Sequence, residues 1–272
     1  MSVGRGICFF IVRRLGTCSP SPGQRACCPS PWDSRCAYRL PVPGGQQKSF
    51  EEMTRIRDLI DPEGERNIPC YHGADGYLPD IHTPCPSEAV ENIIRIVKEA
   101  DGIVYFGMLG CFTNMASALL TEPSIREKVV VIMIGANRFG YHTNNEFNLM
   151  QDRAAARVIL ECGVPVVVLP AMEATERITT TTGEVYYYLK GKTGNIGNYL
   201  CKIYAEDEWV PDDAEGNCSS SQRSLWDLAA VALLRLADQI GDLQMRSADN
   251  CMCSFRTENC KGYTMVSVPL RF

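Results

Sequence analysis

The feature of this sequence that most constrains its fold is a series of short apolar runs without polar alternation. Three of them, GIVYFG at 102–107, VVVIMIG at 129–135 and VPVVVL at 164–169, have the length of strands, and helical patterns separate them. Strands that are apolar on both faces and alternate with helices belong to a parallel sheet that helices cover on both sides. The sequence therefore predicts an α/β fold with a mainly parallel, doubly wound sheet.

The predicted helices begin at cap signals. S-F-E-E at 49–52 has the form of a capping box, in which Ser49 and Glu52 satisfy each other's backbone amides, so it predicts a helix that begins there. Further helices are expected to begin at Ser87 and to span 114–120, 152–162 and 225–240, with a short strand at 67–71 that leads into the glycine-rich loop HGADGYLPD.

The chain divides by composition into three parts. Residues 1–48 are rich in Cys, Pro and Arg with Asp33 as the only acid, and we expect them to be disordered or foreign to the fold. Residues 49–240 form the predicted domain, and residues 241–272 are a tail to which no role is assigned. The apolar run after Arg5 is shorter than the usual h-region of about 7–15 residues, so a cytoplasmic location is expected, with a secretory or organellar leader as the alternative.

Charge and hydropathy narrow the class of partner. The formal net charge is −5, which argues against nucleic acid and anionic membrane surfaces as partners. No apolar run reaches the roughly 18 residues of a membrane helix. A small-molecule ligand is therefore favoured.

Fourteen cysteines leave three interpretations open. They are small buried apolar residues, as at Cys111, Cys162 and Cys201, or part of a disulfide framework, or ligands of a zinc site that includes Cys251 and Cys253. Cys251 and Cys253 have no second pair of cysteines at the spacing that a zinc site needs, which weighs against a zinc site.

Polar residues follow the predicted strands, where parallel sheets bind their ligands. Thr113 and Asn114 follow the first run, and Asn137, Glu146 and Asn148 follow the second. Carboxamides and a carboxylate can donate to and accept from sugar hydroxyls, although each residue alone is also typical of a turn or helix cap. Glu146 and Asn148 lie two apart, so in an extended segment both side chains would point to the same side.

Residues 49 to roughly 240 resemble the inosine-uridine-preferring nucleoside hydrolases in the order of their motifs. The matching segments are IPCYHGA (68–74), GCFTNMA (110–116), NEFN (145–148), DRAAA (152–156) and LWDLAAVALL (225–234). The last has the W-D form of a divergent branch in place of H-D. The resemblance implies the α/β fold of that family and hydrolysis of N-glycosidic bonds in nucleosides or related ribosides.

The resemblance also implies a Ca²⁺ ion at the strand ends that holds the ribose hydroxyls and activates a water. Asp227 matches the downstream calcium carboxylate, and Thr113 matches a residue whose backbone carbonyl completes the metal site. Glu146 and Asn148 match the pair that binds the sugar. A homodimer or homotetramer is the assembly that the resemblance suggests.

Two further candidates have weaker support. Asn137 is added as a substrate-binding residue from its place after a strand. Trp226 stands where better-known members carry a histidine that protonates the leaving base, so that role is not carried over. We interpret Trp226 as a stacking residue for the substrate, with a core or rim tryptophan as the alternative.

The sequence departs from the family near its start. The family's first strand ends in a D-x-D-x-x-x-D-D cluster that supplies two calcium ligands and the general base, and residues 1–48 contain no match. We therefore expect the first strand to be missing and the affinity for calcium to be low. No residue of the sequence is assigned as the catalytic base. Either the chain is a truncated form of an active enzyme or it is a non-catalytic relative that binds ribose or another sugar.

Overall fold

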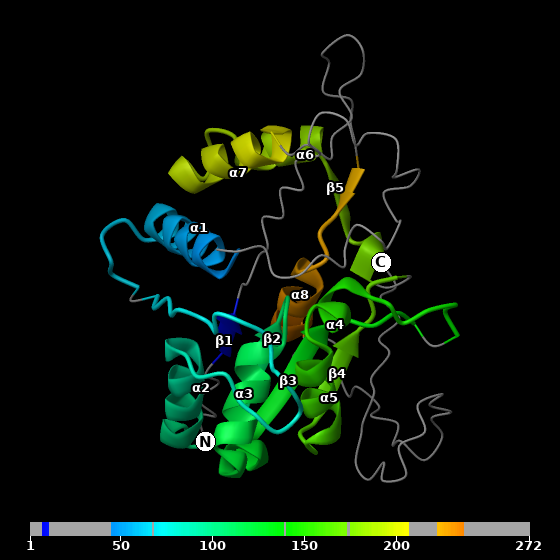
Figure 1. Cartoon of the computed structure of the whole chain (residues 1–272). Helices are drawn as coiled ribbons and strands as arrows, with labels where there is room; N and C mark the ends of the chain where they lie inside the picture. The colour runs from blue at the N-terminus through cyan, green and yellow to red at the C-terminus, as the bar shows by residue number, and fades with distance from the viewer. Residues whose placement is uncertain are drawn as a thin grey trace, which may run out of the picture.

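The computed structural model describes residues 7–10, 45–66, 68–138, 140–172, 175–206 and 222–236 (Figure 1). Its main sheet has four parallel strands in the order β1-β2-β3-β4. The strands are β1 Ile7–Phe10, β2 Val104–Met108, β3 Val129–Ile134 and β4 Val166–Leu169. The three apolar runs form β2, β3 and β4, which confirms the predicted parallel α/β fold.

Strand β1 corrects two expectations. It pairs with β2 in parallel, with Ile7 opposite Tyr105 and Phe10 opposite Met108, so the first strand of the sheet is present. Residues 1–48 are consequently not wholly foreign to the fold. ICFF is long enough to pair with the open edge of β2 and to satisfy backbone groups there. Residues 11–44 and the tail 241–272 lie outside the described residues.

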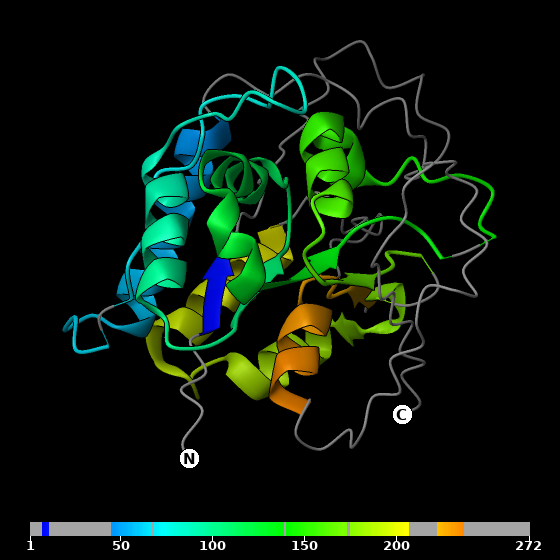
Figure 2. The ribbon, with the colours of Figure 1, turned by 90° about the horizontal axis from the view of Figure 1, so that it is seen from below.

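Helices cover both faces of the sheet, as predicted (Figure 2). On one face lie α2 Glu88–Glu99, α3 Thr113–Thr121 and α5 Arg153–Glu161, and α8 Leu228–Leu236 lies on the other. The larger core cluster includes Ile93, Val97, Phe106, Phe112, Leu119, Val131 and Ile159. Burial of the strands between two helical layers explains why their sequences lack alternation.

Two of the predicted helix starts are confirmed by their caps. The Ser87 hydroxyl accepts from the amide of Val90 at 3.2 Å, and Asp152 accepts from the amide of Ala155 at 2.9 Å. The predicted helix at 225–240 begins only at Leu228, because 225–227 form the turn that follows strand β6. Residues 68–71 form no strand and belong to a loop.

The remaining elements were not predicted. Short elements follow β3 and β4: α4 Phe147–Gln151, the 3-10 helix Thr175–Arg177, and β5 Thr179–Thr181, which pairs antiparallel with β6 Gln222–Ser224. A further 3-10 helix, Pro123–Lys128, precedes β3. Helices α6 Thr182–Leu189 and α7 Gly194–Glu206 lie near α1 at one end of the molecule (Figure 1). Among the described residues, no helix combines the length and apolarity that crossing a bilayer requires.

The predicted capping box at Ser49 is wrong, because helix α1 spans Gly45–Ile60 and Ser49 lies inside it. Glu52 instead turns inward and is 3% exposed. Its carboxylate accepts a hydrogen bond of 2.6 Å from the hydroxyl of Tyr199 on α7 and pairs with Arg55 at 2.8 Å. A buried carboxylate needs such partners, so this tertiary contact replaces the local cap.

We expect Tyr199→Phe to lower the free energy of unfolding by about 1–3 kcal/mol, because Glu52 then loses a partner while it stays buried. Chemical denaturation followed by circular dichroism measures the change. Tyr188→Phe is the matched control, since Tyr188 is 65% exposed on α6. Equal stability of the two variants would show that the Glu52–Tyr199 contact contributes nothing.

Candidate functional site

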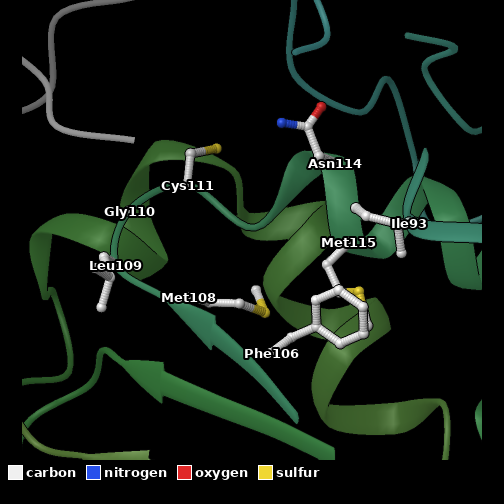
Figure 3. Close-up of a pocket in the computed structure, with 8 residues that line it drawn as sticks. All are labelled: Ile93, Phe106, Met108, Leu109, Gly110, Cys111, Asn114 and Met115. Atoms are coloured by element: carbon white, nitrogen blue, oxygen red, sulfur yellow. The ribbon is translucent and has the colours of Figure 1, made fainter. Parts of the chain in front are cut away.

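The candidate site lies at the carboxyl ends of β2 and β3. The segment 109–114 leaves β2 and enters α3, and the segment 135–137 leaves β3. Figure 3 shows the end of β2, where Cys111 and Asn114 lie above Phe106, Met108 and Met115. The small cavity among these side chains has a volume of about 20 Å³, room for a single water rather than for a sugar.

Glu146 caps the short helix α4, so the expectation of an extended segment from Glu146 to Asn148 is wrong. Its carboxylate accepts from the amides of Asn148 at 3.0 Å, Leu149 at 3.1 Å and Ala136 at 3.2 Å. Burial raises the pKa of Glu146, although these amide hydrogen bonds lower it. The side chain therefore joins the start of α4 to the end of β3.

Asn148 turns toward the same strand end. It is 8% exposed, and its Nδ2 donates to the carbonyl of Ile134 at 2.9 Å. Its Oδ1 accepts from Gln151 Nε2 at 3.5 Å. The structure thus brings Glu146 and Asn148 together at β3, through helix geometry rather than strand alternation.

Asn137 lies beside them in a constrained segment. Its Nδ2 donates to the carbonyl of Thr143 at 2.8 Å, whereas its buried Oδ1 has no hydrogen-bond partner within the described structure. The preceding Ala136 has φ +59°, a left-handed conformation that costs a non-glycine residue roughly 1–2 kcal/mol. A strained backbone next to an unsatisfied acceptor is typical of a ligand-binding segment.

Thr113 is the first residue of α3, and its hydroxyl is part of a buried hydrogen-bond chain. It donates to Asp152 Oδ2 at 2.6 Å and lies 2.9 Å from Cys111 Sγ. Because Thr113 Oγ1 gives its proton to Asp152, it accepts from the Cys111 thiol. Its backbone carbonyl lies in the first turn of α3 and points toward the amide four residues later. As in any α-helix, that carbonyl already accepts a helical hydrogen bond.

The glycine-rich loop at 72–80 and its continuation to Cys85 lie across this edge, where three side chains fix them. The amides of Ala74, Leu78 and Cys85 donate to Asn114 Oδ1 at 2.9 Å, Asp152 Oδ2 at 2.9 Å and Ser117 Oγ at 3.0 Å. Gly73 approaches Asn114 so closely that a Cβ there would lie 2.8 Å from Asn114 Nδ2. In the sequence, Asp152 marked a helix start and the first residue of the DRAAA segment, and neither signal predicted its contact with Leu78.

Trp226 and Asp227 lie in the turn between β6 and α8 and are half-buried. The first turn of α8 packs its Ala229 and Ala230 in one cluster with Leu109, at the end of β2. This packing brings the turn to the carboxyl edge of the sheet, on the face opposite α3.

The described residues do not fit a calcium ion by themselves. Among them, no group of three or more His, Cys, Asp or Glu side chains is placed to hold a metal. The oxygens of Asp152 already accept from Leu78, Thr113 and Ala155, and a hard cation needs six to eight oxygen ligands.

Five cysteines are free thiols in the part of the chain whose side chains the structure describes: Cys70, Cys85, Cys111, Cys162 and Cys201. Of the three that were interpreted as small buried residues, Cys201 is buried, whereas Cys111 and Cys162 are half-buried. The cysteines of residues 11–44 and 241–272, Cys251 and Cys253 included, lie outside the described residues.

Comparison with known proteins identifies similar sequences and folds. A family profile described as inosine-uridine preferring nucleoside hydrolase matches residues 35–268. The pyrimidine-specific ribonucleoside hydrolase RihA of Enterobacter sp. (strain 638) is 31% identical over 172 residues, which cover 61% of this chain and 50% of that protein. RihA of Klebsiella pneumoniae (strain 342) is 30% identical, with 61% and 51% covered.

Among solved structures, a plant nucleoside hydrolase, PpNRh1, aligns with a TM-score of 0.53 at 16% identity and 82% coverage of each chain. At that identity the likeness shows the fold alone. The chain spans about half the length of the curated relatives that it matches.

The site also predicts how Cys111 reacts. Burial raises the pKa of Cys111 to about 11, so little thiolate exists near neutral pH, and it appears only as pH rises toward that value. At pH 8 we expect iodoacetamide to modify Cys111 on the order of a hundredfold more slowly in the native protein than in the urea-unfolded chain. Peptide mass spectrometry follows the reaction, and equal rates in both states would contradict this account.

Proposed function

The chain belongs to the inosine-uridine preferring nucleoside hydrolase family, and from this we propose that it cleaves the N-glycosidic bond of nucleosides or related ribosides. The observation that most supports the proposal is the convergence of Asn137, Glu146 and Asn148 on the end of β3. Strand ends of a parallel sheet are where such folds bind small molecules.

In this proposal the three polar residues hold the sugar. Glu146 and the Oδ1 of Asn137 offer acceptors to ribose hydroxyls, and Asn148 offers a carboxamide that can donate and accept. Trp226, near the same edge, stacks on the base or sugar face. The cytoplasmic location and the homodimer or homotetramer expected from the resemblance belong to the same proposal.

Hydrolysis adds water to the anomeric carbon and releases the base, which takes up a proton. The described residues contribute sugar binding to this reaction. Asp152 is committed to two backbone amides and to the Thr113 hydroxyl. The carboxylate of Glu146 accepts from backbone amides and keeps a lone pair for a ribose hydroxyl. We propose that Ca²⁺ binds this chain weakly, through Asp227 with Thr113 contributing at most its carbonyl.

A second candidate function is binding of ribose or a riboside without turnover. The lack of a metal-binding carboxylate cluster among the described residues favours it. The two functions share the sugar site and differ only in the release of base.

Nucleobase release decides between them. The full chain is incubated with inosine, uridine or a nitrophenyl riboside in millimolar Ca²⁺, and free base is measured by chromatography. Release supports the hydrolase. Binding in calorimetry without release supports the second candidate, and the absence of both rejects the sugar site.

Asn148→Ala tests the sugar site itself. We expect it to weaken riboside affinity by roughly 1–3 kcal/mol, the cost of leaving buried polar partners unpaired. Isothermal calorimetry measures the dissociation constant, and thermal melting controls for loss of folded protein. Asn195→Ala, an exposed change on α7, should leave affinity unaltered. If Asn148→Ala binds as tightly as the wild type, its role is confined to the hydrogen bond with Ile134.

Calcium should stabilise this chain little. A metal that binds the native state at a hundredfold excess over Kd would add about 2.7 kcal/mol, so near-equal melting temperatures in Ca²⁺ and in chelator indicate weak binding. Grafting the family's acidic first strand should create a calcium-dependent rise in melting temperature, and Asp227→Asn should abolish that rise. A grafted protein that melts alike with Ca²⁺ and chelator would make Asp227 only a helix cap.

A further inference from the structure

Asp152 is a buried side chain at the carboxyl edge that connects segments far apart in the sequence. It is 3% exposed, and its two oxygens accept from three separate parts of the chain. Oδ1 accepts from the amide of Ala155 at 2.9 Å, and Oδ2 accepts from the Leu78 amide at 2.9 Å and the Thr113 hydroxyl at 2.6 Å. One carboxylate thus joins the start of α5, the glycine-rich loop and the start of α3.

A helix cap alone does not account for this arrangement. Capping α5 needs one oxygen and one amide, which the contact with Ala155 supplies. The second oxygen binds a backbone amide 74 residues earlier in the chain. An uncompensated buried amide costs about as much as a lost hydrogen bond, so the loop depends on this acceptor.

The loop in turn reaches Asn148, a predicted sugar-binding residue, through Gln151. Tyr77, next to Leu78, donates its hydroxyl to Gln151 Oε1 at 3.5 Å. The amide nitrogen of Gln151 donates to Asn148 Oδ1 at 3.5 Å. With its Nδ2 held by Ile134, the Asn148 carboxamide is therefore oriented from both ends, and one end leads back to the loop.

We propose that Asp152 is a positioning residue of the sugar site. It holds the glycine-rich loop at Leu78, and the held loop orients the Asn148 carboxamide through Tyr77 and Gln151. The effect on sugar binding rests on the proposed function, whereas the effect on the loop and on the Asn148 side chain does not. Asp152 itself is not assigned a contact with substrate.

Asp152→Asn separates this role from capping. The carboxamide keeps an oxygen for the Ala155 amide but presents Nδ2, a donor, to the Leu78 amide. Thr181→Ala is the matched control, because it removes a side-chain cap of the same kind from α6. Thr113→Val takes one donor from Asp152 and leaves the Leu78 contact in place.

The experiment measures three quantities on the full chain. Hydrogen exchange resolved by NMR reports the Leu78 amide, the side-chain NH₂ signal of Asn148 reports its orientation, and calorimetry reports riboside affinity. In Asp152→Asn we expect Leu78 to exchange about tenfold faster or more, the Asn148 signal to shift, and affinity to fall at least about fivefold. Thr181→Ala and Thr113→Val should keep the Leu78 protection.

The outcomes are distinct. Unchanged exchange at Leu78 in Asp152→Asn overturns the proposal, and so does faster exchange with an unshifted Asn148 signal and unaltered affinity. A wild-type protein that binds no riboside refutes the proposed function instead. The Leu78 exchange and the Asn148 signal then still decide whether Asp152 positions the site.

Discussion

The structure depends on one constraint, which is that an apolar parallel sheet must be covered on both faces. Strands β2, β3 and β4 carry apolar side chains on both sides, so α2, α3 and α5 pack on one face and α8 on the other. Connections of this kind return every strand in the same direction, and all carboxyl ends meet at one edge. The polar segments at 109–114 and 135–137 are therefore brought together by the sheet, whatever they bind.

At that edge the polar side chains serve the backbone first. The carboxylates of Glu146 and Asp152 each satisfy several amides where loops enter helices, and Asn148 satisfies the last carbonyl of β3. Such contacts make the site rigid before any ligand arrives, which is how a protein lowers the entropic cost of binding. They also commit the carboxylate oxygens of Asp152 to donors from three segments of the described chain.

Strand β1 and helix α1 illustrate how local signals are outweighed. Residues 1–48 have an unusual composition, yet ICFF pairs with β2 because the sheet edge offers unpaired backbone groups. At α1 a capping-box pattern was present, but Glu52 gains more from Tyr199 on α7 than from its own helix start. In both cases a partner distant in sequence decided the outcome, and no local pattern identified it.

The sequence by itself determined the class of fold, strands β2, β3 and β4, the starts of α2 and α5, and the cluster of polar residues after the strands. Hydrophobic periodicity and caps are local properties, which is why sequence suffices for them. Only the tertiary structure decided that Glu146 and Asn148 meet through a helix turn and that Asp152 accepts from the Leu78 amide. It also decided that the packing of α8 brings Asp227 to the carboxyl edge of the sheet, on the face opposite α3. The physical reason is that a buried polar atom must find a partner, and which partner lies within about 3 Å is settled only when the whole chain has packed.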